Sequence, residues 1–165
     1  MAKTNSDVEM IAAPNMLQIK IGGPIGAVDM HLIEKAEGAL QAMRSDFVLW
    51  LEDEVEKLEK AAVVVREKGL KGKEGEDLFI RAHDLRGLGS TYEFPLITRL
   101  ASSMTKLIDI PEKRQVAPLG LVLAHVNAIR AALVQNIRDS GDPIADELAG
   151  ELEAMAIAFE APWKD

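Results

Sequence analysis

Apolar residues recur every three or four positions through most of this chain, and that spacing is the strongest constraint on its fold. A clear example is the set Phe47, Leu51, Val55, Leu58 and Ala62. Residues spaced in this way share one face of an α-helix, which turns once in about 3.6 residues. Apart from a hint at residues 17–21, no stretch shows the strict alternation of a half-buried strand. The sequence therefore predicts an all-α protein.

The composition supports helices around an aliphatic core. Apolar residues make up 48% of the 165 residues but aromatic residues only 4%, a mix that suits helices better than a sheet. The chain has no cysteine, which excludes disulfides, thiolate metal sites and thiol catalysis and is consistent with the cytoplasm. The net charge of −8 argues against a nucleic-acid partner. We see no signal peptide and no apolar run of membrane-spanning length, so we expect a soluble cytoplasmic protein with no membrane partner.

Glycine and proline divide the chain into an N-terminal tail, residues 1–27, and a single helical domain, residues 28–165. Part of the tail could dock on the domain through Met16, Leu17, Ile19 and Ile21. The predicted helices span approximately 30–43, 45–68, 76–91, 95–108, 113–140 and 143–159, the fifth becoming regular only at Pro118. Short connections between long amphipathic helices favour antiparallel neighbours. We therefore expect an antiparallel up-down-up-down four-helix bundle made of the second to fifth helices, with the terminal helices packed outside.

Helical spacing also predicts which faces are buried. In the third helix the predicted core residues are Leu78, Ala82, Leu85 and Leu88. In the last helix they are Ile144, Leu148, Leu152, Met155 and Phe159.

His83 lies on the outer face of the third predicted helix. It is two positions from Leu85, which is about 200° around a helix axis, so its imidazole should point into water. Arg86 and Gly87 follow three and four residues later and share that face. A glycine inside a helix costs about 1 kcal/mol relative to alanine, so Gly87 and Gly89 need reasons. Gly89 suits close packing of another helix of the same protein. Gly87 suits an outward surface without a protruding side chain, on which a partner protein can dock closely.

The stretch Ala82-His83-Asp84-Leu85-Arg86-Gly87 resembles the signature of histidine phosphotransfer (HPt) domains, which is His, any residue, an apolar residue, a basic residue (usually Lys) and Gly. Ser90 supplies the small polar residue often found one turn further along, and residues 96–104 resemble the next helix of such domains, ending near Asp109. The similarity covers about residues 45–140 in architecture, whereas the specific motif covers only 82–104. The chain has Arg86 where these domains usually have lysine. Arginine keeps the positive charge but can bind phosphate through two hydrogen bonds, whereas lysine acts as a compact point charge.

The resemblance implies a phosphoryl carrier of multistep two-component signalling, with no independent enzymatic turnover. His83 would accept the phosphoryl group from an aspartyl phosphate and pass it to another aspartate, with Arg86 as charge support. Its partners would be response-regulator receiver domains and a hybrid sensor histidine kinase. The protein would need no cofactor of its own, because the receiver supplies Mg²⁺. Phe79 and Ile80 would form an apolar rim for the partner, and Gly87 and Ser90 would keep the far side low.

Two other interpretations remain open at this point. The face around His83 could dock a receiver or kinase without relaying phosphate, or it could be an accidental feature of a structural bundle. The other histidines favour bland roles: His125 lies among apolar residues and should be a core or core-edge residue with one hydrogen-bond partner, and His31 should lie on the surface. The acidic cluster at residues 52–56 should be a solvated face, and no metal site is expected.

Overall fold

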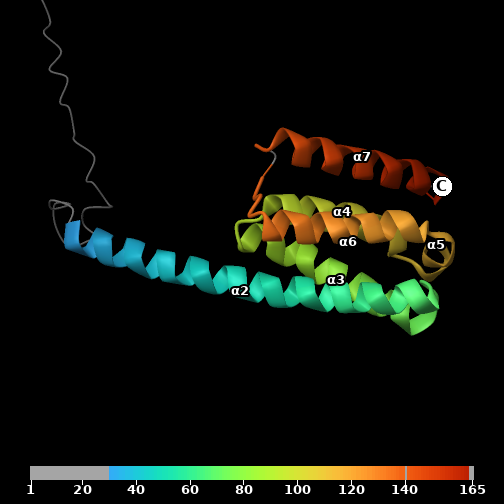
Figure 1. The fold of residues 1–165 in the computed structure, drawn as a ribbon, viewed down its shortest axis with the longest axis horizontal. Helices are drawn as coiled ribbons and strands as arrows, with labels where there is room; N and C mark the ends of the chain where they lie inside the picture. The colour runs from blue at the N-terminus through green and yellow to red at the C-terminus, as the bar shows by residue number, and fades with distance from the viewer. Residues whose placement is uncertain (1–29, 140, 164–165) are drawn as a thin grey trace, which may run out of the picture. The chain divides into compact units, whose positions relative to one another are not determined.

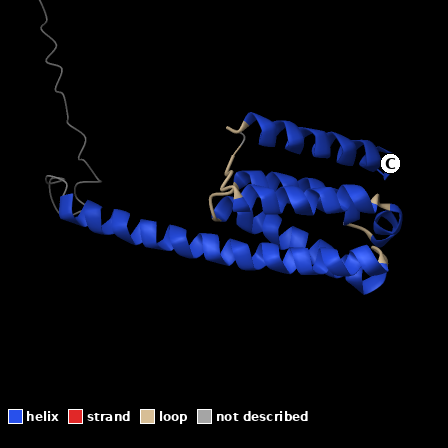
Figure 2. Cartoon of the chain, viewed as in Figure 1, coloured by secondary structure: helices blue, strands red, loops and turns tan. Residues whose placement is uncertain are grey.

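The computed structural model describes residues 30–139 and 141–163, and every regular element in them is helical (Figure 2). The helices are α2 (Met30–Lys68), α3 (Gly72–Thr91), α4 (Pro95–Ile108), α5 (Pro111–Val116), α6 (Leu119–Val134) and α7 (Pro143–Glu160), followed by one 3₁₀ turn, η1 (Ala161–Trp163). The all-α prediction is confirmed. The predicted N-terminal tail, residues 1–27, lies outside the described residues.

Residues 42–165 form one compact unit in which α4 packs against α3, α6 and α7 (Figure 1). α4 takes this place because apolar side chains surround it, and its buried residues include Leu96, Ile97, Leu100, Met104 and Leu107. The part of α2 in this unit adds Leu51, Val55, Leu58, Ala62 and Val65 to the same core. Residues up to Gln41 group separately, and their described part forms the first turns of α2.

The two helices predicted over 30–43 and 45–68 are one helix, α2. Ser45 and Asp46 are residue types that often begin a helix, and their presence suggested a break. No glycine or proline occurs between residues 39 and 68, so nothing interrupts the backbone hydrogen bonds there. Cap-type residues alone weaken a helix only slightly, which is why the predicted break was wrong.

α3 begins at Gly72, four residues before the predicted start at 76, and its first turn includes both Gly72 and Gly75. Gly69 and Gly72 have φ of 84° and 69°, in the left-handed region that favours glycine. A Cβ at Gly75 would collide with the Leu70 carbonyl oxygen, so only glycine fits there. These glycines build the tight entry into α3.

The helix predicted over 113–140 is two helices, and both boundaries have local causes. Ala117, which precedes Pro118, is extended with ψ of 137°, and this ends α5 before α6 begins. α6 ends at Val134 because Asn136 takes a left-handed φ of 54°. The amides of Asn136 and Ile137 donate to the carbonyls of Leu133 and Ala132, a Schellman-type closure.

The predicted apolar stripe of α7 is largely wrong. The structure buries Ala149, Leu152 and Ala156, whereas Ile144, Leu148 and Met155 are 79%, 48% and 52% exposed. Two alanines let α7 approach α4 closely. Arg99 on α4 fixes the rotation of α7, because its Nε and Nη2 donate to the two carboxylate oxygens of Glu153 at 2.9 and 2.8 Å.

Candidate functional site

α3 presents His83 on its solvent side. The opposite face of the helix carries Leu78, Ala82 and Leu85, all with 0% exposure, and His83 itself is exposed. The predicted orientation of His83 is therefore confirmed. The predicted core residue Leu88 is only half-buried, and Gly89 takes its place in the interface with α4.

Arg86 lies beside the imidazole one turn along the helix. Its Nη2 is 3.3 Å from His83 Nδ1, and both side chains are exposed. A guanidinium can only donate, so the contact fits a neutral ring with its lone pair on Nδ1 and its hydrogen on Nε2. The Nε2 atom has no hydrogen-bond partner among the described residues. The contact shows that the Arg86 guanidinium reaches the imidazole.

The two glycines of α3 have different surroundings. A Cβ built on Gly87 would meet nothing within 4 Å, so the space beside His83 is open. A Cβ on Gly89 would lie 2.6 Å from Thr98 Oγ1 and 2.8 Å from Thr98 N, so glycine is required where α3 crosses the start of α4. The sequence interpretation of Gly89 as a packing residue is confirmed, and Gly87 lies on the open side.

A shallow hollow of about 330 Å³ adjoins the imidazole. It is lined by Glu54, His83, Asp84, Gly87 and Leu88, so α2 supplies one wall and α3 the other. Glu54 belongs to the acidic cluster assigned to a solvated face, and sequence reasoning did not connect it with His83. No sequence signal gives the rotation of α2 against α3, which places Glu54 there.

The predicted partner-contacting residues surround His83 unequally. The Phe79 ring lies 5.8 Å from the His83 ring between centroids, and Ile80 is 45% exposed. Phe79 is half-buried, and the Arg114 guanidinium lies over its ring, 5.5 Å from the centroid. Ser90 is exposed, and its hydroxyl donates to Thr98 Oγ1 at 3.0 Å. Phe79 thus contacts the imidazole directly, whereas Ser90 is tied to the start of α4.

His125 is a core residue, as predicted, although it has two hydrogen-bond partners and not one. Its Nδ1 lies 2.8 Å from the Leu121 carbonyl oxygen and its Nε2 2.9 Å from Ser103 Oγ. The carbonyl can only accept, which places the hydrogen on Nδ1 and leaves Nε2 to accept from the serine. Burial lowers the pKa of His125, so the ring is held neutral and inaccessible to a partner. Within the described residues no three His, Asp or Glu side chains gather into a metal site.

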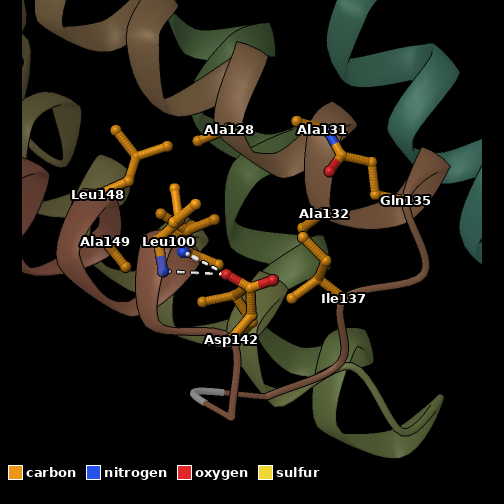
Figure 3. A pocket seen from close by; sticks show the side chains of 12 residues that line it. Leu100, Ala128, Ala131, Ala132, Gln135, Ile137, Asp142, Leu148 and Ala149 are labelled. Carbon is orange, nitrogen blue, oxygen red and sulfur yellow. Dashed lines mark hydrogen bonds between the residues drawn. The ribbon is translucent and has the colours of Figure 1, made fainter.

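A second hollow lies between α4, α6 and α7 and includes no residue of α3 (Figure 3). It measures about 160 Å³ and is mostly apolar, with Leu100, Ala128 and Leu148 in its walls. At its edge Asp142 caps α7 by accepting from the amides of Ile144 and Ala145, each at 3.0 Å. Asp142 is the one ionisable side chain in its lining, and that carboxylate is engaged in capping α7.

Comparisons with protein-family models, curated proteins and solved structures find no match for this chain. Among the described helices, none combines the length and the apolar character needed to cross a membrane.

Proposed function

We propose that this protein is a histidine-containing phosphotransfer protein that relays a phosphoryl group between receiver-domain aspartates through His83. The observation that carries the proposal is an exposed imidazole within 3.3 Å of a guanidinium, beside a helix position with no side chain and open space around it. The proposal includes an antiparallel four-helix bundle of α2, α3, α4 and α6. The packing of α4 against α3 and α6 and the short segments that join these helices support that arrangement.

The residues present suit each step of the transfer. A ring nitrogen of His83 attacks the phosphorus of an aspartyl phosphate; the N–P bond forms, the P–O bond breaks, and the aspartate leaves as a carboxylate. Attack through Nε2 requires the ring hydrogen to move to Nδ1, which exposure to water permits. Arg86 then leaves Nδ1 and can donate to the phosphoryl oxygens. Passing the group to a second receiver reverses these events.

A carrier of this kind depends on its partner for catalysis. The receiver would supply Mg²⁺ and the other charge-stabilising groups, while this protein supplies the nucleophile and Arg86. Phe79 and Ile80 would contact the receiver on one side of His83, and the open position at Gly87 would let it approach on the other. We expect a transient interface of modest area. The proposal includes the cytoplasmic location expected from the sequence, and a hybrid histidine kinase as the source of phosphate.

The test is phosphate uptake from a purified receiver domain phosphorylated with acetyl phosphate in the presence of Mg²⁺. Label should appear on His83, mapped by mass spectrometry without acid steps, and should be stable in alkali but lost in acid. The variant His83→Gln should take up no label and keep the helical circular dichroism spectrum of the native protein. His31→Gln, a change at another exposed histidine, is the matched control and should label normally. Label on His83→Gln would remove His83 from the role.

A docking module that binds a receiver or kinase without relaying phosphate is the second candidate. The exposed Ile80 and the open space at Gly87 would serve docking whether or not His83 reacts. Replacing Gly87 with leucine should weaken partner binding under both functions. Only the relay also requires acid-labile phosphate on the protein, so partner binding with no such phosphate would favour docking alone.

A further inference from the structure

Arg114, on α5, is a buried cation whose terminal nitrogens have no acceptor among the described residues. The residue is 7% exposed, and its Nε donates to the Ile108 carbonyl oxygen at 2.9 Å. No ion pair or hydrogen bond to another described residue engages Nη1 or Nη2. The neighbouring Lys113 is also buried, but its ammonium contacts Asp109 at 2.9 Å and the Lys106 carbonyl. The Arg114 guanidinium lies over the Phe79 ring, 5.5 Å from its centroid, and its terminal donors stay available to an acceptor that the described residues do not supply.

Arg114 lines a cavity, and its terminal nitrogens are not fully enclosed by protein. Every fully buried side-chain nitrogen and oxygen among the described residues has a hydrogen-bond partner, so the unpaired Nη groups must reach open space. Arg114 lines a hollow of about 490 Å³, here called the Arg114 pocket. Its lining residues are Leu70, Gly72, Lys73, Glu76, Phe79, Ile80, Asp109, Pro111, Arg114 and Gln115. This volume is within the range of small-molecule sites, about 300–1,000 Å³.

The charges around the Arg114 pocket favour an anion. Lys73 adds a second cation from the first turn of α3, and α3 has no side-chain cap at its N-terminus. The amides of that turn contribute positive potential, which the Glu74 carboxylate in the same turn offsets in part. Of the two acids in the lining, Asp109 is engaged by Lys113 and by the Ile110 amide. Glu76 is exposed and opposes an anion.

We propose that the Arg114 pocket binds a small organic anion. Its carboxylate or phosphate group accepts hydrogen bonds from the Nη atoms of Arg114, which suit bidentate contact, and pairs with Lys73. Its apolar part packs against Phe79 and Ile80, which present ring and aliphatic surface to the same hollow. This binding does not depend on phosphate relay, and loss of His83 would leave it intact.

Phenyl phosphate is the probe, because it combines the anionic group and the apolar part of the proposed ligand. Its binding to the full chain is followed by ¹H–¹⁵N NMR titration at low ionic strength. Saturable shifts should cluster at Lys73, Phe79 and Arg114. Inorganic phosphate, which lacks the ring, should bind several-fold more weakly, and benzyl alcohol, which lacks the charge, should produce no saturable shift at these residues.

Lys73 and Glu76, two exposed residues of the lining, test the charges of the pocket without disturbing the core. Lys73→Gln should weaken phenyl phosphate binding about two- to fivefold, the effect of one exposed charge. Lys71→Gln, a matched loss of charge outside the lining, should change it less. Glu76→Gln should strengthen binding by a similar factor. Arg114→Gln should abolish it, with thermal unfolding measured to confirm that this variant is folded.

Three results would overturn the proposal. The first is no saturable binding of phenyl phosphate at about 10 mM, which means a binding free energy weaker than about 3 kcal/mol. The second is an equal effect of Lys71→Gln and Lys73→Gln on the affinity, which would indicate general charge attraction, and the third is chemical shift changes located outside the Arg114 pocket. Normal binding of phenyl phosphate by His83→Gln would show that the Arg114 pocket acts independently of the proposed relay. Loss of binding in that variant would contradict the proposed site.

Discussion

Alanine at Gly87 and alanine at Gly89 should change the stability of the protein in opposite directions, although the two positions are neighbours on α3. Alanine is favoured over glycine inside a helix by about 1 kcal/mol, because glycine loses more backbone freedom on folding. A Cβ at Gly87 meets nothing within 4 Å, so Gly87→Ala should gain most of that amount.

The same gain at Gly89 is opposed by a collision. The new Cβ would lie 2.6 Å from Thr98 Oγ1, 2.8 Å from Thr98 N and 3.0 Å from the Phe94 carbonyl oxygen. Two of these atoms are backbone, and the Phe94 amide donates to the Gly89 carbonyl at 2.7 Å, so relief requires moving the start of α4. Overpacking costs about 1–3 kcal/mol, and the upper end applies where backbone must move. Gly89→Ala should therefore lose about 2 kcal/mol net.

Urea unfolding followed by far-UV circular dichroism measures both effects. For a domain of this size the free energy of unfolding falls by about 1–3 kcal/mol per molar urea, so Gly89→Ala should lower the midpoint by roughly 1 M. Gly87→Ala should raise the midpoint, and the slope should stay the same for both. A midpoint for Gly89→Ala at or above that of the native protein would refute the close approach of α3 and α4.

Two further changes test other parts of the structure. Asp142→Ala removes the side chain that caps α7, and should lower the free energy of unfolding by about 1 kcal/mol in the same urea assay, whereas Asp142→Asn should retain most of it. Burial lowers the pKa of His125 below its ordinary value of 6.5, so the unfolded chain binds the proton more readily. The resulting stability is fully present above pH 6.5 and declines as the pH falls toward the folded-state pKa. His125→Gln should flatten that decline, and an unchanged pH profile would contradict the neutral buried ring.

The predictions that depended on local chemistry fared best. Pro95 begins α4 as expected, because a proline lacks the amide that the first turn leaves unbonded in any case. Predictions that required knowing the neighbours fared worse. The end of α6 depends on a left-handed Asn136, and an asparagine in a polar stretch gives little warning of that conformation.

The candidate site divides in the same way. The outward position of His83, the reach of Arg86 and the separate surroundings of the two glycines follow from spacing along one helix. Glu54 joins the hollow beside His83 only through the packing of α2 against α3, and Arg114 reaches Phe79 only through the path of the chain into α5. Neither contact has a signature within either segment.

Helical periodicity and aliphatic composition alone determined that this chain forms helices, and the 3.6-residue repeat determined which side of α3 His83 occupies. Tertiary structure decided which of two apolar faces α7 buries, because two small alanines and the Arg99 ion pairs outweigh the larger side chains that periodicity favours. It also decided that Arg114 would be buried, with its Nε donating to the Ile108 carbonyl oxygen and its guanidinium over the Phe79 ring. Spacing describes one helix at a time, whereas burial is a property of what that helix packs against.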